Sequence, residues 1–450
     1  PIKSSAASDV YKRQLYALIT CKGDEVMAHM KLGKILCAWL AALMLMLSFT
    51  SCAGSEEPQE VEQDGWVSIW ATAAQLADMD QIPTEPSLKE NTCRQVIRAS
   101  IAGDKIRLTF SNQYGNIPLE LDSVHIAKLL YAGSPEIDVS TDTVVTFNGG
   151  SESISIEPGM TATSDEIDFS FEALDLLAVS TKFGKYIGSS VTCHKESYAS
   201  AWVCEGDHVS DQTLSGVKVM GSWYYLVGAD TWAPAGTKAI VALGDSITDG
   251  VGASTNTYTT WPNQLDELLK SNPDTANISV VNMGISGNVL LGEWGETAKN
   301  RLERDVLSVP GVKYCILLIG INDIGGAQED ISEDIIADYK EIIETCHANG
   351  IEIYAGTLTP VKGNFYYSEL HEKIRLAVND FVMSPDSGFD GYIDFSASIA
   401  REDDPAQMKD EYNCSWGDFL HPGDLGYEQM GKEAYESLLT YWAEPEQEEE

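Results

Sequence analysis

The spacing of apolar residues along the chain changes character near residue 237. Before it, short runs alternate with a period of two, as in Ile106, Leu108 and Phe110, and turn-forming residues interrupt the runs. A period of two is typical of strands that bury one face. Many short strands separated by turns favour a sandwich or a jelly roll. Residues 66–236 are therefore predicted to form an all-β domain of this kind.

After residue 237, apolar runs and helical stripes alternate. Residues 239–243 (AIVAL) form a continuous apolar run that ends at a glycine, as in a strand buried on both faces. Farther along, Ile335, Tyr339 and Ile342 recur at helical spacing. Strands that alternate with helices imply a parallel sheet covered on both faces, so residues 237–443 are predicted to form an α/β domain. The ligand crevice of such a sheet lies beyond the carboxyl ends of its strands.

Four polar motifs fall at predicted strand ends or in loops of the α/β domain. They are residues 244–250 (GDSITDG), 282–288 (NMGISGN), 320–323 (GIND) and 418–423 (DFLHPG). Ser246 directly follows a buried strand, so a strand-to-helix turn would expose its hydroxyl and leave its amide free to donate. Each motif alone is common turn chemistry, but all four in this order indicate a catalytic site.

Together these motifs resemble the four blocks of the SGNH (GDSL-type) hydrolases, and the resemblance covers nearly the whole α/β domain. It implies a three-layer α/β/α sandwich in which Ser246 is the nucleophile, His421 its general base and Asp418 the residue that orients the imidazole. The Ser246 and Gly287 amides and the Asn322 side chain would form the oxyanion hole. The resemblance implies no metal and no organic cofactor.

The all-β domain carries a looser resemblance. Residues 94–100 (RQVIRAS), 108–112 (LTFSN) and 163–165 (TSD), with 359–360 (TP) in the α/β domain, are similar to a two-domain subgroup of SGNH proteins. That subgroup resembles acylhydrolases of xylan-degrading rumen bacteria, which implies carbohydrate O-acetyl or aryl ester substrates. The domain itself is expected to be a rigid cap, with a carbohydrate-binding or cleft-lining role as the alternative.

The favoured activity is hydrolysis of short acyl esters, above all acetyl groups on plant polysaccharide such as xylan. A lipid or lysophospholipid acylhydrolase and a non-catalytic surface glycan-binding protein are the alternatives. Trp294 and Trp416 lie near motif blocks and are candidates for contact with a sugar or acyl group, whereas Trp261 is expected in the core. Asp245 and Asp323 are expected to position their loops through local hydrogen bonds.

Acidic residues far outnumber basic ones. The chain has 29 Lys and Arg residues against 69 Asp and Glu residues, a formal net charge of −40. Such a surface repels phosphate backbones and anionic headgroups, which argues against nucleic acid as a partner. The 10 Trp and 19 Tyr residues indicate a folded chain rather than a disordered one.

The ends of the chain are set apart from the fold. Residues 9–14 (DVYKRQ) resemble the translation of a transposase end used in sequencing libraries, so residues 1–29 are expected to be a non-native extension, with a genuine extension as the alternative. Residues 53–65 are acidic and lack apolar periodicity, as in a tether. Residues 444–450 form an acidic tail.

Residues 30–52 have the pattern of a lipoprotein signal peptide. Two lysines precede a charge-free apolar run, and the run ends in a lipobox-like FTSC at Cys52, with Phe49 in place of the usual aliphatic residue. The apolar run is shorter than the roughly 20 residues of a membrane span. The protein is therefore expected to be exported, either as a surface lipoprotein attached to the membrane through Cys52 or as a secreted protein.

Six of the nine cysteines follow the tether. Cys193 and Cys204 are close in a strand-rich stretch and could form a disulfide in an exported protein. They could instead form a zinc set with His194 and His208, although the spacing matches no common zinc pattern. Cys315 lies inside an apolar run and is expected in the core.

Overall fold

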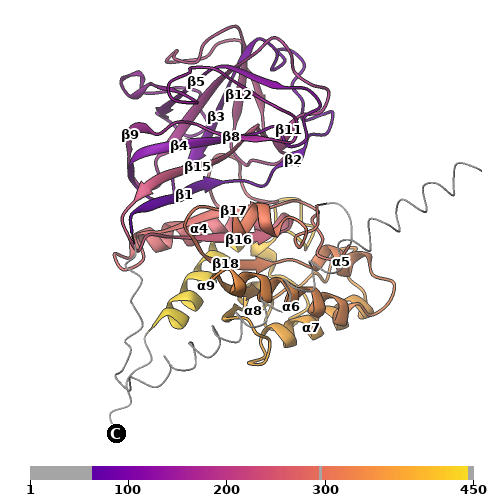
Figure 1. The fold of residues 1–450 in the computed structure, drawn as a ribbon. Helices are drawn as coiled ribbons and strands as arrows, with labels where there is room; N and C mark the ends of the chain where they lie inside the picture. The colour runs from indigo at the N-terminus through magenta and orange to yellow at the C-terminus, as the bar shows by residue number, and fades with distance from the viewer. Residues whose placement is uncertain (1–62, 293–295, 444–450) are drawn as a thin grey trace, which may run out of the picture. The chain divides into compact units, whose positions relative to one another are not determined.

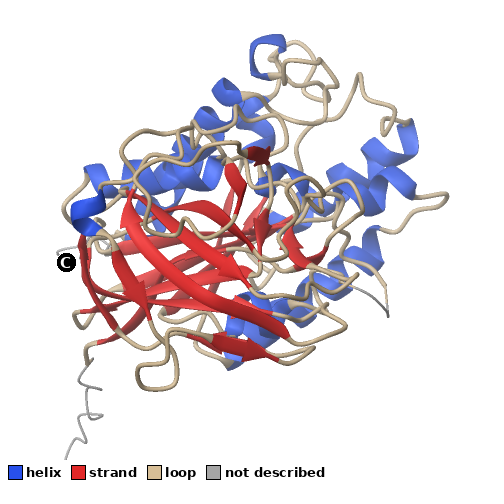
Figure 2. Cartoon of the chain, turned by 90° about the horizontal axis from the view of Figure 1, so that it is seen from above, coloured by secondary structure: helices blue, strands red, loops and turns tan. Residues whose placement is uncertain are grey.

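Strands build residues 63–236, apart from one short 3-10 turn at Val139–Thr141. The computed structural model describes residues 63–292 and 296–443, which lie within one compact unit (Figure 1). The predicted extension, signal peptide and tail, with most of the predicted tether, lie outside the described residues. Among the described residues, every α-helix follows Gly244. Figure 2 draws the helices in blue and the strands in red. The predicted all-β character of the N-terminal region is therefore confirmed.

This all-strand region contains three antiparallel sheets. A five-stranded sheet has the order β1-β15-β4-β8 with β9 on β4, and a seven-stranded sheet has the order β13-β12-β3-β10-β5-β6 with β7 on β5. A third sheet has the order β14-β11-β2. The strands are β1 (Gly65–Ala71), β2 (Gln75–Leu76), β3 (Asn91–Arg98), β4 (Gly103–Ser111), β5 (Leu119–Lys128), β6 (Thr143–Val145), β7 (Ile154–Ile156), β8 (Thr161–Thr163), β9 (Ile167–Phe171), β10 (Leu176–Phe183), β11 (Thr192–His194), β12 (Ala201–Glu205), β13 (Lys218–Met220), β14 (Trp223–Tyr224) and β15 (Leu226–Ala233).

The period-two pattern in β4 has the predicted consequence. Ile106, Leu108 and Phe110 are fully buried, while the residues between them are partly exposed. These three side chains share one hydrophobic core with Leu121 and Val179 of the seven-stranded sheet. Side chains that alternate across a strand thus join the two larger sheets through a common core.

The second region is built on a five-stranded parallel sheet with the order β17-β16-β18-β19-β20. The predicted parallel sheet is therefore confirmed. Helices α4, α8 and α9 contact one another, and α5, α6 and α7 form a second group. The elements are β16 (Lys238–Gly244), β17 (Ile278–Gly284), β18 (Val312–Leu318), β19 (Glu352–Gly356), β20 (Gly391–Ile393), α3 (Ser246–Asp249), α4 (Trp261–Ser271), α5 (Ile321–Gly326), α6 (Ser332–Ala348), α7 (Glu369–Val382), α8 (Phe395–Ile399) and α9 (Asp424–Trp442).

The two regions meet along β1 and β17, which lie side by side in Figure 1. The Ser279 hydroxyl donates to the Ser68 carbonyl at 2.6 Å, and the Val280 amide donates to the Ser100 hydroxyl at 2.9 Å. The Ser100 hydroxyl in turn donates to the buried Asp266 carboxylate at 2.6 Å. Buried polar atoms on both sides of the junction are thereby hydrogen-bonded, which ties the edge of the parallel sheet to the all-strand region.

The cysteines do not form the disulfide that their spacing allowed. Cys193 lies in β11 of the three-stranded sheet and Cys204 in β12 of the seven-stranded sheet, and both are free buried thiols. The zinc alternative is not assembled either, because His194 bonds to Ala73 and Asp249 whereas His208 pairs with Asp211. Sequence proximity placed the two cysteines together, but the strands that carry them pair with different neighbours. Cys315 is fully buried, as predicted.

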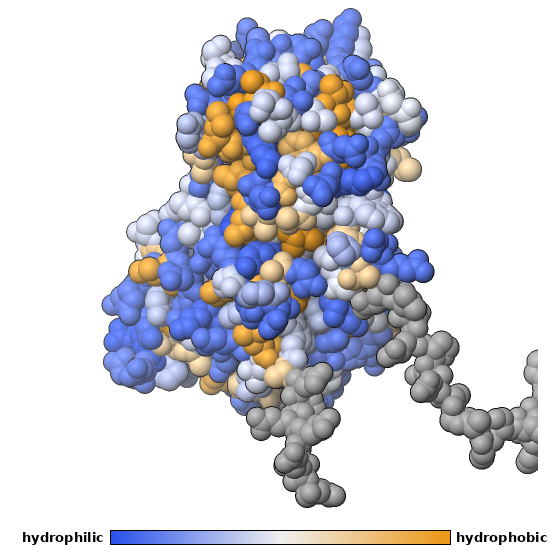
Figure 3. All heavy atoms as spheres, turned by 90° about the vertical axis from the view of Figure 1, so that its left-hand side faces the viewer, coloured by the Kyte–Doolittle hydropathy of each residue, from blue (hydrophilic) through white to orange (hydrophobic). Residues whose placement is uncertain are grey.

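Hydrophilic side chains cover most of the face drawn in Figure 3, and apolar ones appear as smaller groups among them. Within residues 63–292 and 296–443, no helix combines the length and the apolar character that crossing a membrane requires.

Candidate active site

Ser246 lies where β16, an inner strand of the parallel sheet, passes into α3. Asp245 is the N-cap of this short helix, and its carboxylate accepts a hydrogen bond from the Ile247 amide at 3.0 Å. A Cβ on Gly244 would approach the Leu318 carbonyl oxygen to 2.5 Å, so the strand end requires glycine. The first residue of a helix has no intrahelical acceptor for its amide, which leaves the Ser246 N–H available.

The structure brings Ser246, His421 and Asp418 into one chain of hydrogen bonds. Ser246 Oγ lies 2.9 Å from His421 Nε2, and His421 Nδ1 lies 2.7 Å from Asp418 Oδ2. Ser246 and His421 are 175 residues apart in sequence. Nε2 can accept the serine proton only while Nδ1 carries the other ring proton, and the Asp418 carboxylate favours that tautomer.

Asp418 is held by four donors. Its Oδ1 accepts from the Leu420 and His421 amides, each at 2.9 Å, and its Oδ2 accepts from the Trp416 indole at 2.8 Å as well as from His421. Partial burial would raise the pKa of Asp418, but the hydrogen bonds from His421, Leu420 and Trp416 outweigh it, and the pKa lies well below its ordinary value. The carboxylate therefore stays ionised beside the imidazole.

Asn322 is fixed in one orientation at the start of α5. Its Nδ2 donates to the Asn288 carbonyl at 2.8 Å, and its Oδ1 accepts from the Tyr366 hydroxyl at 3.0 Å. An amide nitrogen carries two protons, so one remains for a further acceptor. Gly287 adopts φ +76° at the tip of a turn, and, its chain neighbours aside, none of residues 63–292 and 296–443 has an atom within 4 Å of the position that its Cβ would take.

Arg301 is hydrogen-bonded to the ends of two strands of the parallel sheet. Its buried guanidinium donates to the carbonyls of Gly244 and Met283 at 2.9 and 2.7 Å, to Asn288 Oδ1 at 3.0 Å and to Asp305 at 2.9 Å. The last residues of β16 and β17 and the turn after β17 thus share one rigid donor group. No motif in the sequence pointed to this arginine.

The loop between β19 and α7 holds two parts of the site. Asn364 Nδ2 donates to the Asp418 carbonyl at 2.8 Å, and Tyr366 binds Asn322 as described. Phe365 between them is 86% exposed. Since these bonds join segments 44 and 54 residues apart, sequence spacing offered no signal for them.

Two carboxylates lie beside the site, Asp245 fully buried and Asp323 partly buried. Burial raises the pKa of Asp245 to about 7, and the nearby Asp323 carboxylate adds to the shift. Burial also raises the pKa of Asp323, although the amides of Leu290 and Leu291 donate to its two oxygens at 2.9 Å. Asp245 thereby fixes the backbone that follows Ser246, and Asp323, the neighbour of Asn322, fixes the backbone at Leu290 and Leu291.

The three tryptophans have different surroundings. Trp416 is 59% exposed and is bonded to Asp418, so it lies at the rim of the site. Trp261 is fully buried, as predicted. Trp294 lies outside the described residues.

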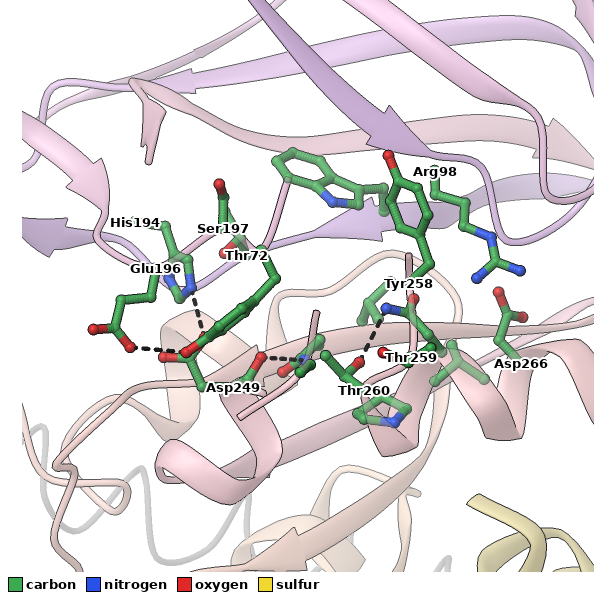
Figure 4. A pocket seen from close by; sticks show the side chains of 18 of the residues that line it. Thr72, Arg98, His194, Glu196, Ser197, Asp249, Tyr258, Thr259, Thr260 and Asp266 are labelled. Atoms are coloured by element: carbon green, nitrogen blue, oxygen red, sulfur yellow. Dashed lines mark hydrogen bonds and ion pairs between the residues drawn. The ribbon is translucent and has the colours of Figure 1, made fainter. Parts of the chain in front are cut away.

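A cavity of about 60 Å³ lies at the junction between the two regions rather than at Ser246 (Figure 4). Its lining includes His194, Glu196 and Tyr258, and it touches the active-site segment through Asp249. In Figure 4 the His194 and Asp249 side chains point toward one another across this junction.

Comparison with known proteins agrees with the motif analysis. Residues 242–429 match the model of the GDSL-like lipase/acylhydrolase family. No curated protein matches the sequence.

Several solved structures are similar to part of the chain. A GDSL-like lipase from Bacteroides thetaiotaomicron is 14% identical over 45% of this chain and 89% of its own, with a TM-score of 0.34. A catalytic mutant of an acetylxylan esterase from Geobacillus stearothermophilus is 19% identical over 45% and 94%, with a TM-score of 0.35. An alpha/beta hydrolase enzyme from the metagenome of Lake Arreo is 19% identical over 46% and 98%, with a TM-score of 0.36.

Proposed function

Since residues 242–429 form a domain of the GDSL-like lipase/acylhydrolase family, the chain is a serine ester hydrolase, and we propose that it removes short acyl groups, chiefly acetyl, from plant polysaccharide such as xylan. The observation that carries the mechanism is the hydrogen-bonded chain from Ser246 through His421 to Asp418. In this proposal the parallel sheet is the middle layer of a three-layer α/β/α sandwich, and the all-strand region is a jelly-roll-like accessory domain.

In the first half-reaction, Ser246 Oγ attacks the ester carbonyl carbon while His421 Nε2 takes the hydroxyl proton. The carbon–oxygen π electrons move to the carbonyl oxygen, which accepts hydrogen bonds from the Ser246 and Gly287 amides and from Asn322 Nδ2. These donors act on charge that exists only in the tetrahedral intermediate, so they lower the barrier rather than the energy of bound substrate. The intermediate then expels the alcohol, which leaves with the proton from His421.

In the second half-reaction, water replaces the alcohol. His421 takes a proton from water, the hydroxide attacks the acyl carbon, and the bond from that carbon to Ser246 Oγ breaks as the proton returns to the serine. Asp418 stabilises the imidazolium in both halves without accepting its proton. Neither half-reaction requires a metal or an organic cofactor.

A sugar on the alcohol side of the ester is supported by the rim of the site. Trp416 is bonded to Asp418, Phe365 adjoins the Tyr366 that binds Asn322, and both aromatic side chains are largely exposed. Exposed aromatic faces offer apolar contact to ring carbons while the polar edges of a sugar stay hydrated. A lipid or lysophospholipid substrate would call for an enclosed apolar groove for its acyl chain.

The test is acetate release from acetylated xylan by the wild-type protein and by Ser246→Ala. Release by the wild type and a loss of about 10⁶-fold in the variant would support both mechanism and substrate. Cleavage of a small aryl acetate without release from xylan would refute the polysaccharide substrate and leave the esterase. No hydrolysis and no labelling by a fluorophosphonate would instead favour the glycan-binding alternative.

Export and lipid attachment through Cys52 are part of the same proposal and rest on the sequence pattern of residues 30–52. Radiolabelled palmitate should enter the protein in a bacterial host and should not enter Cys52→Ala.

A further inference from the structure

We propose that His194 of the all-strand region is a positioning residue for the oxyanion hole, acting through Asp249 on the turn that carries Gly287. The inference rests on the proposed function, because it assigns a task within that site. Under this proposal the all-strand region contributes a residue that positions the oxyanion hole, rather than serving only as a cap. The argument follows one path of hydrogen bonds across the junction.

The path begins at the His194 ring at the end of β11. Its Nδ1 lies 3.0 Å from the Ala73 carbonyl oxygen and its Nε2 lies 3.0 Å from Asp249 Oδ1. Both neighbours are acceptors, so both ring nitrogens must donate, and a histidine with two N–H groups is the imidazolium cation. The His194 and Asp249 side chains are only 4% and 3% exposed, and the Trp223 ring packs against the imidazole with centroids 5.6 Å apart.

Asp249 connects His194 to the second motif block, residues 282–288. It is the last residue of α3, three positions after Ser246. While Oδ1 faces His194, Oδ2 accepts from the Ser286 amide at 2.8 Å. Ser286 immediately precedes Gly287, so this bond fixes the start of the turn that presents the Gly287 amide.

That turn depends on such bonds, because no described residue beyond the chain neighbours of Gly287 has an atom within 4 Å of the position that its Cβ would take. On the far side the turn is held by Asn288, whose amide donates to the Ile285 carbonyl at 3.0 Å and whose Oδ1 accepts from Arg301. The near side has the Asp249 bond. Of the bonds that hold the turn, the one from Asp249 to Ser286 depends on a partner from the other region.

A buried carboxylate without a partner does not keep this arrangement. Removal of the cation leaves an uncompensated charge, which is relieved by protonation, by rotation toward solvent or by entry of water. Each of these changes competes with the hydrogen bond from the Ser286 amide. His194 thus keeps Asp249 ionised and in place, and thereby keeps the Gly287 amide directed into the oxyanion hole.

Three other contacts across the junction lie outside the motif blocks. The Ser279 hydroxyl and the Val280 amide bind the all-strand region from the first half of β17, and Arg98 pairs with Glu267 on α4 at 2.7 Å. None of these three residues of the α/β region belongs to a motif block. Loss of one of these three contacts should therefore not reproduce the effect of losing His194.

The decisive experiment compares His194→Ala with His125→Ala in the full chain. His125 is a matched control, because it is another histidine of the all-strand region that pairs with an aspartate. Its partner, Asp142, lies 2.9 Å away in the same region, and the two side chains are 14% and 16% exposed. Rates of aryl acetate hydrolysis are measured per active site, counted by fluorophosphonate titration. The inhibition constant of an aryl boronic acid, whose tetrahedral adduct places an oxygen in the oxyanion hole, is measured in parallel.

For His194→Ala we expect kcat to fall about 10- to 100-fold with KM changed less than about 3-fold, because displacement of a transition-state donor costs rate rather than binding. The boronate inhibition constant should rise by a similar factor. A merely structural role would lower the number of active sites and leave both quantities unchanged. Values within about 2-fold of His125→Ala would overturn the inference.

His194→Gln covers the case in which His194→Ala does not fold. It keeps an amide N–H for Asp249 but carries no charge, so losses of about 3- to 10-fold in kcat and in boronate affinity are expected. Unchanged values in this variant would also overturn the inference. A wild-type protein that hydrolyses no ester would refute the proposed function itself.

Discussion

Replacement of Asp418 by asparagine tests the central hydrogen-bond chain with one atom changed. Oδ1 of Asp418 faces two backbone N–H groups, so the amide oxygen of an asparagine must take that place. The amide NH₂ then faces His421 Nδ1 and the Trp416 indole, where two acceptor bonds existed before. A donor opposite Nδ1 favours the tautomer with its proton on Nε2, and that nitrogen can no longer accept the proton of Ser246.

The burial of Asp418 sets the size of the effect. Where the orienting aspartate is sealed from water, this substitution costs about 10⁴-fold in kcat. The Asp418 side chain is 23% exposed, so water can partly relieve the mismatch. We therefore expect a loss of about 10³-fold, equivalent to about 4 kcal/mol of transition-state stabilisation at 1.36 kcal/mol per factor of ten.

The assay is the initial rate of aryl acetate hydrolysis per folded molecule between pH 5 and pH 9, with thermal unfolding as a check on folding. Trp416→Phe is the control, because it removes one donor from Oδ2 and keeps the bond from His421; a loss below about 5-fold is expected. An Asp418→Asn rate within tenfold of the wild type would refute the tautomer argument, as would an equal loss in both variants.

Three further predictions follow from neighbouring contacts. Tyr366→Phe removes the donor to Asn322 Oδ1 and should lower kcat about 5- to 10-fold without changing KM for an aryl acetate; a change in KM alone would contradict a role in orienting Asn322. The folded-state pKa of Asp245 is raised to about 7, so ionisation of this carboxyl destabilises the fold as pH rises from about 4 to 7. Asp245→Asn can still cap the helix, and it should add up to about 4 kcal/mol to the free energy of unfolding above pH 7 and little near pH 4. Urea titrations that show the same stability difference at both pH values would refute this explanation. Alkylation in denaturant without reductant should label both Cys193 and Cys204, and a cross-linked peptide in the mass spectrum would show that the thiols are oxidised.

The charge state of His194 gives the junction a pH dependence of its own. Burial lowers the pKa of His194, but the Asp249 carboxylate, the Ala73 carbonyl and the nearby Glu196 outweigh it, and the pKa lies above its ordinary value. A raised folded-state pKa means that the bound proton stabilises the fold at acid pH and that this contribution is lost as pH rises through that pKa. The corresponding part of the pH slope of stability should disappear in His194→Gln.

The sequence by itself determined the elements and the local parts of the site. A period of two indicated β4, because a strand buried on one face needs apolar residues at every second position. A continuous apolar run indicated β16, because a strand buried on both faces needs them at every position. The spacing of Asp418 and His421 lets a single loop present both, and Asp245 caps the helix that Ser246 begins. These relations span a few residues, so local geometry decides them.

Only the tertiary structure decided which distant side chains complete the site. The contacts of Asn322 with Tyr366 and of Asp249 with His194 join positions 44 and 55 residues apart, and Arg301 meets three chain segments at once. The separation of Cys193 and Cys204 into different sheets was equally invisible, because strand pairing rather than sequence distance sets which thiols meet. Residue order fixes the period and the turns, whereas a buried polar group takes whichever partner the packed chain brings within hydrogen-bond reach, and that choice exists only once the chain is folded.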